Sequence, residues 1–254
     1  MRKNAVRRAS IAVRRIALPV LFIVFTYPCG VLLGCGLMFL RMIGFIRVRN
    51  KGRIPWDAKA MEIASNHPSI LDPLVLLLLF FPECILHPFR YVPYIAADKK
   101  LFDRWFLFPL RSRIIFVPRG SALGVYRALL EAQSVLRKGG RVIIFPEGGR
   151  TSRGDMHIVY DGKRLRPLQM GVGRLAASVP VTIVPVWIQD AEKVMPIGAT
   201  FPRFWKGPID ICVGRPLVSS PPSQSSDKEK KVAAKFVTEY VTDAIFQSSY
   251  WDSF

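Results

Sequence analysis

The hydrophobic and polar positions of this chain change their pattern along its length. Residues 16–40 are uncharged and strongly apolar, and a helix of that length can cross a bilayer. From about residue 55, short apolar runs typical of buried strands alternate with stretches that have the period of amphipathic helices. This alternation predicts an α/β fold with a mixed, largely parallel sheet flanked by helices, preceded by an N-terminal membrane-embedded helical segment.

The same pattern locates individual elements. Strands are predicted at residues 60–65, 114–117, 141–145, 181–188 and 209–213, and helices at residues 121–138, 171–179 and 227–247. We expect the first of these helices to turn one apolar stripe inward, formed by Leu123, Tyr126, Leu130 and Val135. The last helix has a comparable stripe, formed by Val232, Phe236, Tyr240 and Ala244.

The apolar N-terminal run is flanked by basic residues on both sides. Six arginines and lysines lie in residues 1–15, and five more lie in residues 41–53. Because basic flanks tend to remain on the cytoplasmic side of a membrane, and because Pro28 and Gly30 interrupt the run, we predict a membrane hairpin with helices at residues 16–27 and 31–40. A single spanning helix and a signal peptide are the competing interpretations.

Composition and charge indicate how the chain is divided and which classes of partner it can bind. The chain divides into a basic membrane anchor at residues 1–53, an α/β domain at 54–217, and a Ser/Pro linker with a C-terminal amphipathic helix at 218–254. A formal net charge of +19 favours anionic partners, either phosphorylated substrates or an anionic phospholipid membrane. Without zinc-finger spacing or an RNP-like aromatic run, nucleic acid is the weaker choice. The four cysteines and three histidines have no ligand spacing, so no metal site is predicted.

Candidate chemistry begins in the segment Asn66–Asp72, between a predicted strand and a very apolar run. A neutral imidazole such as His67 can take a proton from an alcohol, and a carboxylate such as Asp72 can fix its tautomer. A spacing of five residues does not place the two on one helix face, so we expect a turn at Pro68 to bring them together. Alternatively, Asp72 caps a helix that begins at Pro73, and His67 is structural.

A second candidate segment, Phe145–Thr151, directly follows a predicted strand. Its two glycines allow backbone amides to approach an anion, and the fork of Arg150 matches phosphate geometry. An ordinary turn explains the same residues. Residues 115–119 have a similar arrangement, because Arg119 follows a predicted strand and could bind phosphate in the same way. For this segment alone, an arginine in a solvated loop is the simpler interpretation.

Together, four blocks in this order resemble the glycerolipid acyltransferase family typified by lysophosphatidic acid acyltransferase. The blocks are residues 66–72, 115–119, 145–151 and 183–186, and the resemblance covers roughly residues 50–190. The chain departs from the family pattern at Pro118, where an acid is usual, and at Gly149, where threonine is usual. Residues 168–171 replace a Phe-Lys pair before a glycine, and the loop at 153–167 is longer than usual.

The resemblance implies a membrane-bound enzyme with its acyltransferase domain on the cytoplasmic face. It would move a fatty acyl group from acyl-CoA or acyl carrier protein to lysophosphatidic acid, giving phosphatidic acid, with no metal and no cofactor besides the thioester. His67 would be the general base and Asp72 its orienting carboxylate. The substrate-binding residues would be Arg119, Glu147, Gly148, Gly149, Arg150 and Thr151.

Within this set of residues, the two arginines would hold the acceptor phosphate. Glu147 would either order its loop or bind a glycerol hydroxyl. Two alternatives remain open at this point: an acyltransferase for another lysophospholipid, and a catalytically degenerate protein that only binds membranes. The second alternative is disfavoured by the presence of His67, Asp72, Glu147 and Arg150.

Overall fold

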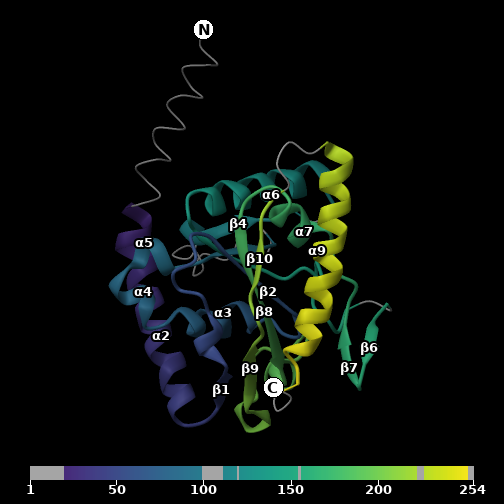
Figure 1. The fold of residues 1–254 in the computed structure, drawn as a ribbon. Coiled ribbons are helices and arrows are strands. Elements are labelled where there is room, and N and C mark those ends of the chain that lie inside the picture. The colour runs from purple at the N-terminus through teal and green to yellow at the C-terminus, as the bar shows by residue number, and fades with distance from the viewer. Residues whose placement is uncertain (1–19, 99–110, 119, 154–155, 222–225, 251–254) are drawn as a thin grey trace.

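A computed structural model of the chain describes residues 20–98, 111–118, 120–153, 156–221 and 226–250. Within these residues, eight strands form one sheet in the spatial order β1-β9-β8-β2-β5-β3-β4, with β10 paired to β8. Five neighbouring pairs are parallel, and only β8 with β9 and β8 with β10 are antiparallel. Helices lie on both sides of this sheet (Figure 1). The predicted mixed, largely parallel sheet flanked by helices is confirmed.

The elements follow one another closely along the chain. The strands of the main sheet are β1 (Ile46–Arg49), β2 (Met61–Ser65), β3 (Tyr94–Ala97), β4 (Ile114–Phe116), β5 (Arg141–Ile144), β8 (Val181–Gln189), β9 (Ile209–Val213) and β10 (Leu217–Ser219). A separate hairpin consists of β6 (Ile158–Tyr160) and β7 (Lys163–Leu165). The helices are α2 (Tyr27–Met42), α3 (Asp72–Leu77), α4 (Glu83–Leu86), α5 (Pro88–Tyr91), α6 (Ala122–Arg137), α7 (Gly171–Ala176), α8 (Ala191–Val194) and α9 (Asp227–Gln247). The described residues include the 3-10 segments η2 (Lys51–Arg53), η3 (Leu78–Phe80) and η6 (Phe204–Lys206), and η1 (Phe22–Thr26) is a π-helical segment.

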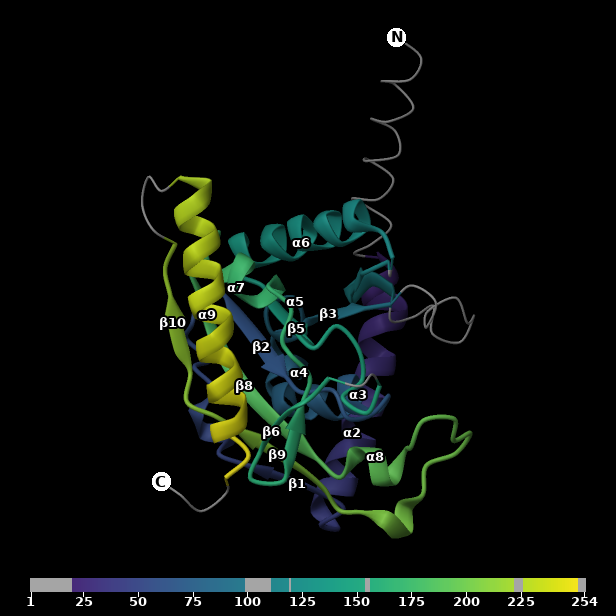
Figure 2. The same cartoon turned by 90° about the vertical axis from the view of Figure 1, so that its right-hand side faces the viewer.

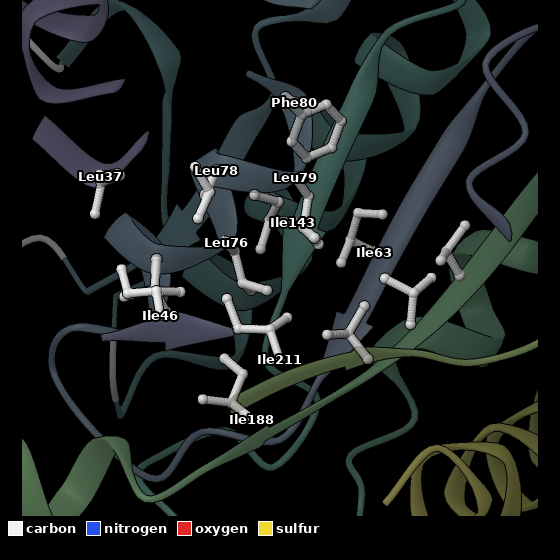
Figure 3. Packing of buried hydrophobic residues seen from close by; sticks show 14 of the residues in the cluster. Leu37, Ile46, Ile63, Leu76, Leu78, Leu79, Phe80, Ile143, Ile188 and Ile211 are labelled. Carbon is white, nitrogen blue, oxygen red and sulfur yellow. The ribbon is translucent and has the colours of Figure 1, made fainter. Parts of the chain in front are cut away.

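The sheet separates two hydrophobic clusters. Along β2, Met61 and Ile63 face the cluster that contains α3 and η3, whereas Ala64 faces the cluster beneath α6, α7 and α9, as the alternation of side chains in a strand requires. Figure 3 shows Leu76 and Ile211 meeting in the first of these clusters. Because β2 is covered on both faces, it forms a rigid base for the loop that follows it.

Three central parallel strands, β2, β5 and β8, bring two polar loops to one edge of the sheet. β2 lies between β5 and β8 and is paired in parallel with both, so the carboxyl ends of all three strands meet at that edge. The loop after β2 and the loop after β5 are in direct contact there, since the Thr151 N–H donates to the His67 carbonyl at 2.7 Å. Distant parts of the sequence therefore share one site.

The N-terminal apolar segment differs from the predicted hairpin. Helix continues without a turn from η1 through α2, and Pro28 stands in the first turn of α2, directly after the π-helical segment. Proline at this position removes one helical hydrogen bond because it has no N–H, and the wider π-helical turn before it leaves room for its ring. The hairpin prediction is therefore wrong. Residues Phe22–Met42 are the one helix among the described residues that is long and apolar enough to cross a membrane.

The predicted inward face of α6 is wrong for three of its four residues, since only Val135 packs against the core. Leu123, Tyr126 and Leu130 are exposed, and the buried side chains are Ala128, Ala132 and Leu136. Small side chains let the helix axis approach the sheet closely, so the larger apolar side chains point outward.

Helix α9 repeats this arrangement. Its predicted stripe residues Val232, Phe236 and Tyr240 are exposed, whereas Ala234 and Val241 are buried. The backbone of Ala234 lies so close to Gly173 of α7 that a side chain at residue 173 would collide with it. Figure 2 shows α9 and α6 on the same side of the sheet. Both helices therefore expose apolar side chains that the sequence pattern assigned to the interior.

Candidate active site

The contact between His67 and Asp72 is the centre of the site. The Nδ1 atom of His67 lies 2.7 Å from Oδ2 of Asp72, although the residues are five apart and on no common helix face. The predicted turn is present, and α3 begins only at Asp72. Asp72 does not cap this helix through its side chain, so its carboxylate is directed at the imidazole instead.

The geometry fixes the tautomer of His67. An ionised carboxylate can only accept hydrogen bonds, so Nδ1 carries the proton and Nε2 keeps a lone pair. Among the described residues, no group hydrogen-bonds to Nε2, and the His67 side chain is 17% exposed. The ring stacks on Phe145 with centroids 4.2 Å apart. The imidazole is therefore held on two sides, with one nitrogen available to a hydroxyl group.

Two neighbouring polar residues hold the loop in place. The Asn66 amide donates to the Ile188 carbonyl at 2.8 Å and accepts from the Ile188 N–H at 2.7 Å. The Ser69 hydroxyl donates to the Met195 carbonyl at 3.0 Å, which ties the loop to the segment after α8. These buried bonds connect the His67 loop to the end of β8, and a loop fixed in this way keeps its catalytic geometry without a ligand.

Burial sets the protonation of Asp72. The carboxyl group is fully buried, which raises its pKa to about 6, partly offset by the hydrogen bonds from His67 and from the Ser69 N–H at 2.7 Å. Glu192 raises the same pKa through its charge. At pH 7 Asp72 is still ionised, and it can stabilise a positive charge that forms on the imidazole.

Glu147 has a different environment. Oε1 accepts from the His67 N–H at 2.6 Å and from the Thr151 hydroxyl at 2.7 Å, and Oε2 accepts from the Arg166 N–H at 2.9 Å. Burial raises the pKa of Glu147, and these hydrogen bonds oppose that rise. Since both oxygens are occupied within the protein, the geometry favours the first of the two predicted roles, which is to order the loop.

The structure brings most of the predicted substrate-binding residues together. Gly148 has a φ of 68°, a left-handed conformation that favours glycine, and it forms the turn between Glu147 and Gly149. Arg150 is half-buried and follows this turn directly. Arg119 lies outside the described residues. The site therefore contains the predicted dyad and the complete 145–151 segment.

Sequence reasoning missed two contributors to this site. Arg166 was not selected, because it lies in the long loop at 153–167, where no motif marked it. Phe145 belongs to the third block, yet its stacking on His67 is a long-range contact that local patterns do not predict. The length of the loop was the one available signal for Arg166.

An apolar cavity of about 80 Å³ lies between α2 and α3. It is enclosed by the buried side of α2, at Gly30 and Gly34, and by Leu74 and Leu77 of α3. Asp72 is the first residue of the same helix α3. The α3 side chains that line the cavity therefore follow Asp72 in the chain, and their apolar character suits hydrocarbon.

Comparison with known proteins agrees with this geometry. A family model described as Acyltransferase matches residues 45–189. A protein described as a probable 1-acyl-sn-glycerol-3-phosphate acyltransferase, from Mycoplasma pneumoniae, is 28% identical over 132 residues, which are 51% of this chain and 44% of that protein. The chain thus matches less than half of the length of this curated relative.

The fold is also similar to a solved structure. The crystal structure of the 1-acyl-sn-glycerophosphate (LPA) acyltransferase PlsC from Thermotoga maritima superposes with a TM-score of 0.53 at 20% identity, covering 95% of this chain and 99% of that one. At this identity the likeness concerns the fold. The family model, in contrast, covers more than half of the 254 residues and spans the dyad and the Phe145–Thr151 segment. The resemblance inferred from the four blocks is confirmed, and this chain belongs to the acyltransferase family.

Proposed function

We propose that this protein transfers a fatty acyl group from a thioester to the free hydroxyl of lysophosphatidic acid and so forms phosphatidic acid. The observation that carries the proposal is the 2.7 Å contact between His67 Nδ1 and Asp72, which leaves Nε2 accessible in a chain of the acyltransferase family. The name of the Mycoplasma pneumoniae relative supports lysophosphatidic acid as the acceptor.

The reaction follows from the tautomer of His67. Nε2 removes the proton of the acceptor hydroxyl while that oxygen attacks the thioester carbonyl carbon, and Asp72 stabilises the imidazolium that forms. The tetrahedral intermediate then collapses, the carbon–sulfur bond breaks, and the imidazolium returns its proton to the departing thiolate. The products are an ester and a free thiol, and His67 is again neutral. No acyl-enzyme is required, because the hydroxyl attacks directly.

Substrate binding is proposed for the positive and apolar parts of the site. Arg150, together with Arg119, binds the acceptor phosphate, since an arginine fork matches phosphate oxygens. The cavity beside α3 accepts part of a hydrocarbon chain. Either acyl-CoA or acyl carrier protein supplies the thioester.

Membrane association is proposed from the exposed face of the N-terminal helix. Leu32 is 75% exposed, and Ile23 and Phe39 are also exposed, whereas Leu37 on the opposite side packs into the core. An apolar helix face that is open to solvent is stabilised in a bilayer. The basic residues around this helix favour contact with an anionic phospholipid surface, and the acyltransferase domain is proposed to lie on its cytoplasmic face.

The test is an acyl-transfer assay with the purified full chain in detergent–lipid micelles. Oleoyl-CoA is offered with lysophosphatidic acid, lysophosphatidylcholine or lysophosphatidylglycerol, and the free thiol and the phospholipid product are measured. We expect thiol release that depends on lysophosphatidic acid and on His67. Faster transfer to another lysophospholipid would change the acceptor. A folded protein that binds lipid without any thiol release would instead be a degenerate membrane-binding member of the family.

A further inference from the structure

Arg166 enters the site from outside the motif blocks. Its backbone N–H donates to Oε2 of Glu147 at 2.9 Å, so the residue is fixed directly against the loop after β5. The preceding residue, Leu165, ends strand β7 and is fully buried. A buried residue on one side and a hydrogen bond to a buried carboxylate on the other leave the backbone of Arg166 little freedom.

The guanidinium of Arg166 occupies the space that a side chain at Gly149 would need. A Cβ placed on Gly149 would lie 2.6 Å from Nη1 of Arg166, closer than two such atoms approach in proteins. The φ of Gly149 is not in the left-handed region, so the glycine is not required by its backbone. Its use here is to make room for the guanidinium.

The hairpin that carries Arg166 is anchored on α9 and on the site. Tyr160 of β6 packs against Phe246, with ring centroids 6.1 Å apart, and the Lys163 ammonium donates to the Ser249 carbonyl at 2.5 Å. At the other end, His157 is 2.6 Å from the Thr151 carbonyl. Figure 1 shows β6 and β7 beside the C-terminal half of α9. These contacts hold the β6–β7 hairpin in place, and Arg166, which follows the hairpin directly, is thereby positioned at the Gly148–Gly149 turn.

The charge of Arg166 is not neutralised by a neighbour. Among the described residues, its guanidinium forms no ion pair and no hydrogen bond, and the residue is half-exposed. A guanidinium has five N–H donors and remains charged at every physiological pH. A positive group that is held against a catalytic loop without a protein partner suits a phosphate of the substrate.

We propose that Arg166 is a substrate-binding residue whose guanidinium, seated in the space left by Gly149, binds the phosphate monoester of the acceptor. The inference rests on the proposed function and deepens it, because it names a group that selects lysophosphatidic acid. The same chemistry occurs in the 3′-phosphate of CoA, so the experiment separates the two sources.

The first arm compares Arg166→Gln with the matched control Arg164→Gln. Arg164 is exposed on strand β7, two residues before Arg166. We expect Arg166→Gln to raise the KM for lysophosphatidic acid about 10- to 100-fold, as loss of a charged phosphate partner does, with kcat changed much less. Arg164→Gln should behave as the wild type. An unchanged KM for lysophosphatidic acid in Arg166→Gln would overturn the inference.

The second arm replaces oleoyl-CoA by oleoyl-dephospho-CoA, which lacks the 3′-phosphate. If Arg166 binds the acceptor, the defect of Arg166→Gln is the same with both donors. A defect that appears in the KM for oleoyl-CoA and disappears with the dephospho donor would assign Arg166 to the donor and refute the proposal. Binding of lysophosphatidic acid without a donor separates the hypotheses: if the wild type binds it through Arg166 but transfers nothing, only the proposed function fails.

The third arm uses Gly149→Ala to test whether the space at residue 149 positions the guanidinium of Arg166. The added methyl group meets only the flexible end of Arg166, so the protein should unfold at nearly the wild-type temperature while the guanidinium is displaced. We expect a rise in the KM for lysophosphatidic acid similar to that of Arg166→Gln, and no further rise in the double variant, because both changes remove one interaction. Independent, multiplicative effects of the two substitutions would overturn the pairing of Gly149 with Arg166.

Discussion

The loop after β2 and the loop after β5 each contain a buried carboxylate, and the two carboxylates differ in their partners. Asp72 is 0% exposed and Glu147 is 1% exposed. Asp72 accepts from an imidazole that is open to substrate, whereas Glu147 accepts from two backbone amides and one hydroxyl. Burial alone therefore does not identify a catalytic carboxylate. The hydrogen-bond partners of a carboxylate identify its role. A carboxylate contributes to the reaction only when a partner, such as the His67 imidazole, becomes charged during it and is stabilised by the negative charge.

The two loops also depend on each other. Glu147 binds the N–H of His67, and Thr151 binds its carbonyl, so the loop after β5 fixes the backbone of the catalytic histidine. The first loop is expected to supply chemistry and the second to supply geometry and phosphate binding. Variants of the two loops should therefore change different measured quantities.

The largest effect is expected for His67→Ala, which removes the proposed general base. General base catalysis typically contributes about 10²–10⁴-fold, so kcat should fall at least by that factor. Because the buried Asp72 carboxylate also loses the hydrogen bond from the imidazole, the melting temperature should fall moderately while the fold is retained. The measurement is thiol release beside thermal unfolding. Near-normal turnover of a folded His67→Ala protein would remove the base assignment.

Asp72→Asn should lower kcat by a factor comparable to, or smaller than, that of His67→Ala. The amide no longer provides the negative charge that stabilises the imidazolium, and it disturbs the tautomer that Asp72 selects. The KM for the acceptor should remain close to that of the wild type. A variant that keeps full kcat and loses only stability would show that Asp72 is structural, as Glu147 is expected to be.

Glu147→Ala should reduce stability more than it reduces chemistry per folded molecule. It leaves the His67 N–H, the Arg166 N–H and the Thr151 hydroxyl without their acceptor, and each unsatisfied buried donor costs about 1–3 kcal/mol. We expect the free energy of unfolding to fall by about 3 kcal/mol or more in denaturant titrations. Unchanged stability with abolished turnover would instead make Glu147 a catalytic group.

The pH dependence separates activity from stability at Asp72. Its pKa is raised by burial from 3.8 to about 6, so between these values the folded protein holds a proton that the unfolded chain releases. The contribution of Asp72 to the free energy of unfolding is therefore largest below about pH 4. It is lost as the pH rises through 6, and the total loss is about 3 kcal/mol. Activity should change in the opposite direction, falling as the pH drops below 6.

The measurement for this prediction is a pair of profiles from pH 4 to 8, one of kcat and one of the free energy of unfolding. Other buried carboxyl groups, among them Glu62 and Glu192, also have raised pKa values, so the contribution of Asp72 is the difference between wild type and Asp72→Asn. If that difference does not depend on pH, Asp72 has an ordinary pKa and the argument from burial fails.

The smallest effect is expected for Arg150→Lys, which keeps the charge but removes the planar fork. Losing a bidentate phosphate contact while retaining a point charge should raise the KM for lysophosphatidic acid about tenfold and leave kcat nearly unchanged. Arg150→Gln should raise it further. A change confined to the KM of the thioester would assign Arg150 to the donor.

The sequence alone located five strands of the main sheet and the helices α6, α7 and α9, and it offered His67 and Asp72 as a candidate pair. Both depend on local information: apolar periodicity, and a proline-containing segment that can form only a turn. The Glu-Gly-Gly-Arg segment was found for the same reason, since its residue types are suited to a tight turn and to anions wherever they occur. The family resemblance depends on these local blocks.

The tertiary structure decided which surface each element buries and which distant residues meet. The apolar stripe of α6 pointed outward because a row of small residues, including Ala128, packs more closely on the sheet than larger side chains do. Tertiary contacts on one face of α2 stabilise it as a continuous helix rather than a hairpin. One of them is the hydrogen bond that the Tyr27 hydroxyl donates to the Ile85 carbonyl. Arg166 reached the site only through a hairpin anchored on α9. Such contacts join residues far apart in the chain, and a local pattern has no means of ranking them.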